Sequence, residues 1–115
     1  MGPTIEDQQL DALFTALSDR TRRDIVARLS TGEATVKELA EPYAMSMQAV
    51  SQHIRVLERS GLISQGRHRQ TRPCRLEPAA LETALSWIEE SRRTWSDRMD
   101  RLETHLARLQ ERENQ

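Results

Sequence analysis

The sequence is poor in the residues on which disulfide-bonded, membrane-spanning and base-stacking proteins depend. It has one cysteine, Cys74, which excludes an intramolecular disulfide and favours the reducing cytoplasm. No uninterrupted apolar run exceeds three residues, whereas a transmembrane helix needs about 20. The first twenty residues also lack the apolar stretch of a signal peptide. Aromatic residues make up only 3% of the chain, which argues against a module that stacks bases on exposed rings.

Signatures of catalysis and of metal binding are missing as well. We find no Gly-rich phosphate loop, paired-carboxylate signature or nucleophile motif, so we expect neither an enzyme nor a cofactor. The histidines at 53, 68 and 105 lack metal-ligand spacing, and Cys74 with His68 would supply only two of the four ligands of a structural zinc site. We therefore expect no metal. Cys74 could sense redox changes if neighbouring arginines lowered the pKa of its thiol, although a lone thiol is more often inert.

A length of 115 residues suits one domain, and its charge is unevenly distributed. The whole chain has a net charge of -1, but residues 1–40 carry -2, residues 41–76 carry +4 and residues 77–115 carry -3. A basic middle between acidic arms is typical of a localised site for a polyanion. The same split can also arise by chance scatter, and charge alone does not decide between the two.

Three short helices are predicted in the first forty residues. Their apolar faces are Leu10, Leu13, Phe14 and Leu17 in the first, Ile25, Val26 and Leu29 in the second, and Val36, Leu39 and Ala40 in the third. Ser18 and Asp19 interrupt the first helix and can cap the second, which ends in a turn at Gly32. Thr35 and Glu38 form a capping box for the third helix, which Pro42 ends.

Ser46 is expected to cap a fourth helix that ends at Gly61. Its inward face would hold Met47, Val50, Ile54 and Leu57, and its outward face Gln48, Ser51, Gln52, Arg55 and Arg59. Residues 62–65 and 72–76 predict two short strands around a turn at residues 66–71. This hairpin carries four arginines and no acid: Arg67, Arg69, Arg72 and Arg75.

The order helix, turn, polar-faced helix and basic hairpin is that of a winged helix-turn-helix. A major groove about 12 Å wide admits one helix, in which Gln can pair with adenine and Arg with guanine. A helix N-terminus at Ser46 can face a phosphate, and the hairpin can follow the backbone or insert an arginine into the minor groove. A polar helix face alone is more often plain solvated surface. Its combination with the basic hairpin favours binding to duplex DNA.

The last helix, opened by Pro78, carries the clearest periodic pattern of the chain. Its seam alternates spacings of four and three: Leu81, Leu85, Ile88, Arg92, Trp95, Met99, Leu102, Leu106 and Leu109. Ala84 and Trp87 widen the stripe near its start, so that part is expected to pack within the chain. The distal part needs a partner, and we expect a second copy to meet Trp95, Met99, Leu102, Leu106 and Leu109. The alternative is a helix that folds back on its own domain.

Three segments of the sequence resemble the ArsR family of bacterial dimeric repressors over residues 10–76. They are ALSDRTRRDIV from Ala16, TVKELA from Thr35 and MSMQAVSQHIRVLERSGLI from Met45. The resemblance implies that Ser46, Gln48, Ser51, Gln52, His53 and Arg55 approach DNA, with Arg69 and Arg72 on the wing. Metal sensors of the family carry cysteines on the helix that matches Thr35 to Ala40, or His and acids on the last helix. The matching helix of this chain has no such cysteines, and its last helix has His105 as its one histidine, with scattered acids. It also has Cys74 where the wing usually carries an aromatic residue, beside Pro73, which can make the strand short or irregular.

These observations predict a mainly α fold: a winged helix-turn-helix of four helices and a two-stranded wing, followed by a long C-terminal dimerisation helix. We assign residues 1–115 to a single domain, with the DNA-binding region at 6–76 and the dimerisation helix at 78–113. The expected function is a cytoplasmic, nucleoid-associated regulator, and by the family resemblance a repressor, that binds a pseudo-palindromic operator as a homodimer. The alternative is a winged-helix adaptor that binds proteins and no DNA. The residues name no effector.

Overall fold

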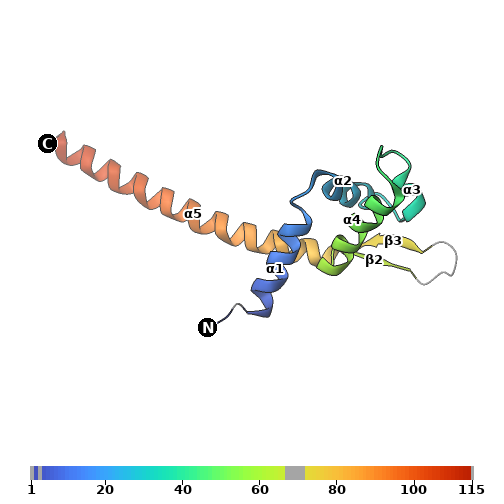
Figure 1. Ribbon diagram of the computed structural model, residues 1–115. Coiled ribbons are helices and arrows are strands. Elements are labelled where there is room, and N and C mark those ends of the chain that lie inside the picture. Colours follow the sequence, from blue (N-terminus) through green and yellow to red (C-terminus); the bar gives the residue numbers. More distant parts are fainter. Residues whose placement is uncertain (1, 3, 67–71, 115) are drawn as a thin grey trace. The chain divides into compact units, whose positions relative to one another are not determined.

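The computed structural model describes residues 2, 4–66 and 72–114 as five helices and three short strands (Figure 1). The helices are α1 (Ile5–Ala16), α2 (Arg20–Leu29), α3 (Val36–Ala40), α4 (Met47–Ser60) and α5 (Pro78–Glu113), and the strands are β1 (Ala34–Thr35), β2 (Ile63–Gln65) and β3 (Pro73–Leu76). The chain forms two compact units, Met1–Ala84 and Leu85–Gln115. The mainly α, winged helix-turn-helix class predicted from the sequence is confirmed.

The helix ends follow the capping signals of the sequence. The side chain of Asp19 caps α2 by accepting from the Arg22 backbone N–H at 3.0 Å. Thr35 and Glu38 form the expected capping box at α3, and Gly61 ends α4 with a φ of 87°, a left-handed conformation that glycine adopts at little cost. A further capping box, between Thr4 and Asp7 at the start of α1, was not predicted.

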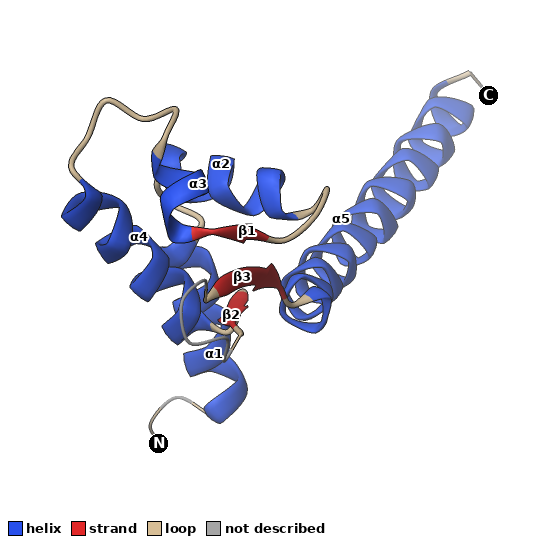
Figure 2. Ribbon diagram, turned by 90° about the vertical axis from the view of Figure 1, so that its right-hand side faces the viewer, coloured by secondary structure: helices blue, strands red, loops and turns tan. Residues whose placement is uncertain are grey.

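The sheet has one strand more than the expected two-stranded wing. β3 lies between β1 and β2 and pairs antiparallel with both, with Cys74 opposite Ala34 on one side and Gln65 on the other (Figure 2). A strand of two residues is too short to show an alternating pattern, so β1 could not be predicted from the sequence. Pro73 lies at the start of β3, where its missing N–H interrupts the ladder least.

The core of the first unit is built from the apolar faces of its helices. Leu13, Ile25, Leu39, Ile54 and Leu57 are almost completely buried, and burying each such side chain contributes about 1.5–3 kcal/mol. The inward position predicted for two further residues is wrong. Met47 is 50% exposed and Phe14 is 38% exposed.

Helix α5 continues without interruption from Pro78 to Glu113. Ala80 and Ala84 are buried in the first unit, as expected for the start of the stripe, whereas Trp87 is 49% exposed. The distal apolar residues are open to solvent: Trp95 is 60% exposed, Leu102 48%, Leu106 51% and Leu109 42%, and Met99 is partly buried. Among the residues that the structure describes, no helix is long and apolar enough to cross a membrane.

Candidate nucleic-acid interface

Helix α4 is held in the first unit by one buried side. Val50, Ile54 and Leu57 are at most 1% exposed and belong to the main core cluster. At the N-terminus of the helix, the hydroxyl of Ser46 accepts a hydrogen bond from the backbone N–H of Ala49 at 3.1 Å. The buried side therefore fixes the rotation of α4 and presents its polar side to solvent.

The polar side of α4 forms a surface depression of about 540 Å³. Its lining residues are Ser46, Met47, Gln48, Ala49, Ser51, Gln52 and Arg55. The structure thus brings together five residues that the sequence predicted as DNA contacts and adds Met47 and Ala49. Met47 is the first residue of the helix and lies among these polar neighbours, which explains why it is exposed.

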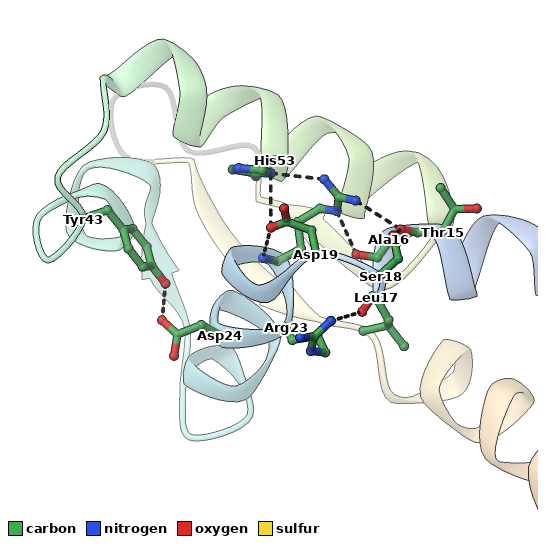
Figure 3. Close-up of polar contacts among 10 residues, drawn as sticks. Thr15, Ala16, Leu17, Ser18, Asp19, Arg23, Asp24, Tyr43 and His53 are labelled. Atoms are coloured by element: carbon green, nitrogen blue, oxygen red, sulfur yellow. Dashed lines mark hydrogen bonds and ion pairs between the residues drawn. The ribbon is translucent and has the colours of Figure 1, made fainter.

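His53 lies outside this depression and contacts α2. Its side chain is 22% exposed, and its Nδ1 atom lies 3.2 Å from Nη1 of Arg22 and 3.9 Å from Oδ2 of Asp19 (Figure 3). These contacts give His53 a packing role between α2 and α4. The DNA contact that the family resemblance implies for His53 stays a prediction.

Arg22 is the centre of this contact, and sequence reasoning missed it. Besides its bond to His53, its guanidinium donates to the carbonyl oxygens of Ala16 at 2.8 Å and Thr15 at 3.1 Å. These carbonyls belong to the last turn of α1, where the carbonyl oxygens have no hydrogen-bond donor within the helix. The backbone N–H of Arg22 holds the pKa of the Asp19 carboxyl below its usual range, and the charge of the Arg22 guanidinium acts in the same direction. One arginine thus ties α1, α2 and α4 together.

The wing is described only in part. Arg67 and Arg69 lie outside the described residues, as does His68, so their predicted roles stay predictions. Arg72 is exposed just before β3. Arg75 is exposed in β3, with Nε 3.9 Å from Oε1 of Glu33.

Cys74 faces the core and is not suited to redox sensing. Its side chain is fully buried, and burial, together with the charge of Glu58, raises the pKa of its thiol to about 11. The possibility that neighbouring arginines lower this pKa is therefore wrong. Among the residues that the structure describes, no group of three or more His, Cys, Asp or Glu side chains could hold a metal ion.

A second depression, of about 630 Å³, lies beside the turn that precedes α4. It is lined by Arg20, Thr21, Arg23, Asp24 and Tyr43. The Tyr43 hydroxyl donates to the Asp24 carboxylate, and the guanidinium carbon of Arg28 lies 5.6 Å from the centre of the Tyr43 ring. These contacts brace the turn between α3 and α4 against α2.

The comparison with known proteins agrees with this geometry. Residues 17–65 match the family model of a helix-turn-helix domain. The HTH-type transcriptional regulator Rv2034 of Mycobacterium tuberculosis is 42% identical over 78 residues, which are 65% of this chain and 73% of the relative. The transcriptional repressor SdpR of Bacillus subtilis is 30% identical over 79 residues, which are 69% of this chain and 88% of SdpR. A crystal structure of an ArsR family transcriptional regulator has a TM-score of 0.73 at 39% identity, over 76% of this chain and 97% of the other.

The chain belongs to the ArsR family of winged helix-turn-helix transcriptional regulators. The helix-turn-helix match runs from the end of α1 to the end of β2. It therefore includes the whole depression on α4 and the Arg22 contact with His53.

Proposed function

We propose that this ArsR family chain is a transcriptional repressor that binds an operator as a homodimer, with α4 in the major groove. The observation that carries the proposal is the depression on α4, whose polar lining projects from a helix with a fully buried opposite side. A recognition helix needs this combination, because base readout requires hydrogen-bonding side chains held at a fixed rotation.

The lining residues suit different parts of the DNA. Gln48 and Gln52 are exposed amides that can pair with adenine, and the exposed guanidinium of Arg55 can pair with guanine. Ser46 and the first backbone N–H groups of α4 are suited to a phosphate. The wing arginines Arg67, Arg69 and Arg72 would add contacts to phosphates or to the minor groove beside the major groove that α4 occupies.

The homodimer is supported by the exposed seam of α5. Trp95, Leu102, Leu106 and Leu109 are each between 42% and 60% exposed and repeat at heptad spacing. A second copy of the chain can bury this apolar seam against its own identical seam. Two recognition helices then match half-sites about 34 Å apart on one face of a duplex.

Repression is the regulatory action we propose, because SdpR, which shares 30% of its aligned residues with this chain, is a transcriptional repressor. A repressor of this kind competes for promoter DNA by binding alone and needs no catalytic step. It acts where the bacterial chromosome lies, in the cytoplasm.

The proposal is tested by a fluorescence anisotropy titration of the full chain with duplexes from the upstream region of its own gene. A shuffled duplex of the same length is the control. We expect tighter binding to one upstream duplex and a loss of about a thousandfold or more in affinity between 50 and 200 mM salt, the range for six or more phosphate contacts. Equal absence of binding to both duplexes at 50 mM salt would contradict the proposal and favour a protein-binding adaptor.

A further inference from the structure

The second depression, beside the turn before α4, has a basic lining whose charge the rest of the chain leaves available. We call it the α2 depression; its lining residues are Arg20, Thr21, Arg23, Asp24 and Tyr43. Both arginines are exposed residues of α2. Within the part of the chain that the structure describes, neither arginine forms an ion pair with a carboxylate. The side chain of Arg23 donates one hydrogen bond there, to the carbonyl of Leu17 at 2.8 Å.

The acid of the α2 depression is bound by Tyr43. The Tyr43 hydroxyl donates a hydrogen bond to the Asp24 carboxylate (Figure 3). Arg20 lies four positions before Asp24 on the same helix, and an arginine that precedes an acid is the weaker order for such a pair. Because Tyr43 holds the carboxylate, the guanidinium groups of Arg20 and Arg23 keep donors for a ligand with negative charge.

The α2 depression adjoins the end of α4 that the proposed function places in the major groove. Tyr43 precedes the N-cap residue Ser46 by three positions, and Ser46 lines the depression on α4. Only Ala44 and Met45 separate the two linings at this point of the chain. A helix that enters a groove about 12 Å wide brings the residues beside its N-terminus to the sugar-phosphate backbone at the edge of the groove.

We infer that the α2 depression binds a backbone phosphate of the operator DNA beside the groove that α4 occupies; this inference rests on the function proposed above. Arg20 and Arg23 supply the positive charge, and the hydroxyl of Thr21 can donate a further hydrogen bond. A guanidinium group suits a phosphate because its planar donors can bind two oxygens at once. The contact adds affinity and fixes the position of α4 in the groove, but it reads no base.

Arg20→Gln in the full chain tests this contact through the salt dependence of binding. The side chain of Arg20 has no ion pair within the described part of the chain, so urea unfolding should be unchanged. In anisotropy titrations between about 50 and 200 mM salt, affinity for the operator and for the shuffled duplex should fall by the same factor. The slope of log affinity against log salt should decrease by about one for each copy of the chain, and so by about two for a dimer.

Arg108→Gln is the matched control for the change in net charge. It removes the same charge from an exposed position of α5 and should leave the salt slope as it is in the original chain. A salt slope that is also unchanged in Arg20→Gln overturns the inference.

Duplexes with one neutral phosphate identify the partner of Arg20. In each duplex a methylphosphonate, which carries no charge, replaces a single phosphate of the operator. At the phosphate that the α2 depression binds, this replacement should weaken binding of the original chain about threefold or more. It should leave the affinity of Arg20→Gln nearly unchanged, because that contact is already lost. Equal losses for the two chains at every phosphate overturn the inference.

Asp24→Asn should change the affinity in the opposite direction. The amide oxygen can still accept a hydrogen bond from the Tyr43 hydroxyl, but the α2 depression loses its one acid. We expect both duplexes to bind about threefold more tightly, since a repulsion between Asp24 and the phosphate is removed. Asp100→Asn, at an exposed position of α5, is the control and should change the affinity less. An affinity that does not rise in Asp24→Asn overturns the inference.

The outcomes separate this inference from the proposed function and from a free anion as the ligand. If the original chain binds the operator but Arg20→Gln has the original salt slope, the phosphate contact alone is overturned. If inorganic phosphate then shifts the amide NMR signal of Thr21 in the free chain, the α2 depression binds a small anion instead of DNA. A chain that binds neither duplex at about 50 mM salt overturns the proposed function, and the phosphate contact with it.

Discussion

Arg22 donates a hydrogen bond to Nδ1 of His53 at 3.2 Å, and this bond joins the start of α2 to the middle of α4. The same guanidinium donates hydrogen bonds to the carbonyl oxygens at the C-terminal end of α1. The polar face of α4 thus depends on a residue that lies outside the depression it presents to solvent.

We expect Arg22→Ala to lower the free energy of unfolding by about 1.5–3 kcal/mol, because it removes charge-assisted hydrogen bonds from a partly buried site. Urea unfolding followed by circular dichroism measures the change. Arg23→Ala is the matched control: Arg23 is exposed and donates one bond, to the carbonyl of Leu17 at 2.8 Å, so its loss should cost less than about 1 kcal/mol. Equal losses in the two variants would show that the Arg22 contacts stabilise the fold no more than the single bond of Arg23 does.

A double-mutant cycle isolates the bond between α2 and α4. His53→Ala alone should destabilise the chain, and we expect Arg22→Ala/His53→Ala to cost less than the sum of the single changes by about 0.5 kcal/mol or more. Strict additivity of the two effects would mean that the bond contributes nothing to stability.

The cap at Asp19 makes part of the stability depend on pH. Because the pKa of Asp19 is lowered in the folded chain, its charged form stabilises the fold above the unfolded value of about 4. That contribution is lost as the pH falls through the lower folded value. Asp19→Asn keeps a capping oxygen but removes the charge. We therefore expect the stability difference between the original chain and Asp19→Asn to shrink between about pH 5 and pH 3, as measured by urea unfolding across that range. A difference that is constant over this range would exclude a contribution from the charge.

Arg55→Ala should weaken operator binding by about 1–3 kcal/mol and reduce the preference over random DNA, if Arg55 contacts a base edge. Anisotropy titrations with both duplexes measure the two quantities. Arg59→Ala is the control, since Arg59 is exposed on the same helix but does not line the depression. An equal loss of affinity for operator and random DNA would make Arg55 a phosphate contact instead.

Leu102→Asp should convert the dimer into a monomer, because it places two carboxylates in an apolar seam where no cation pairs with them. Sedimentation velocity measures the mass, and operator binding should weaken in parallel because the two half-sites are no longer bound together. Thr104→Asp introduces the same charge on the far side of the helix and should stay dimeric. A dimeric Leu102→Asp chain would show that the seam is not the interface.

Cys74 should resist a thiol reagent such as Ellman's reagent in the folded chain at about pH 8 and react fully after unfolding in urea. Burial accounts for both, since it blocks access and raises the pKa of the thiol from 9.0 to about 11. Above about pH 9 the unfolded thiol ionises while the folded one stays protonated, so stability should fall as the pH rises further. Rapid modification of the folded chain would contradict the burial.

Local signals in the amino-acid sequence were enough to predict most of the helices and their ends. The caps at Asp19, Thr35 and Ser46, the glycine end of α4 and the heptad pattern of α5 each depend on residues a few positions apart, and all reappear in the structure. The polar face of α4 follows from the same short-range periodicity. For this reason most of the depression on α4 was predictable.

The contacts between distant parts of the chain could be identified only from the folded structure. The pairing of β1 with β3, the turn of His53 toward Arg22 and the burial of Cys74 depend on contacts between residues tens of positions apart. Met47 is a further example. The helical pattern predicts on which side of α4 it lies, but it does not predict whether another element packs over the N-terminal end of the helix and buries it. The periodicity of one helix predicts the direction in which each of its side chains points, whereas the burial of a side chain depends on which other elements pack against it.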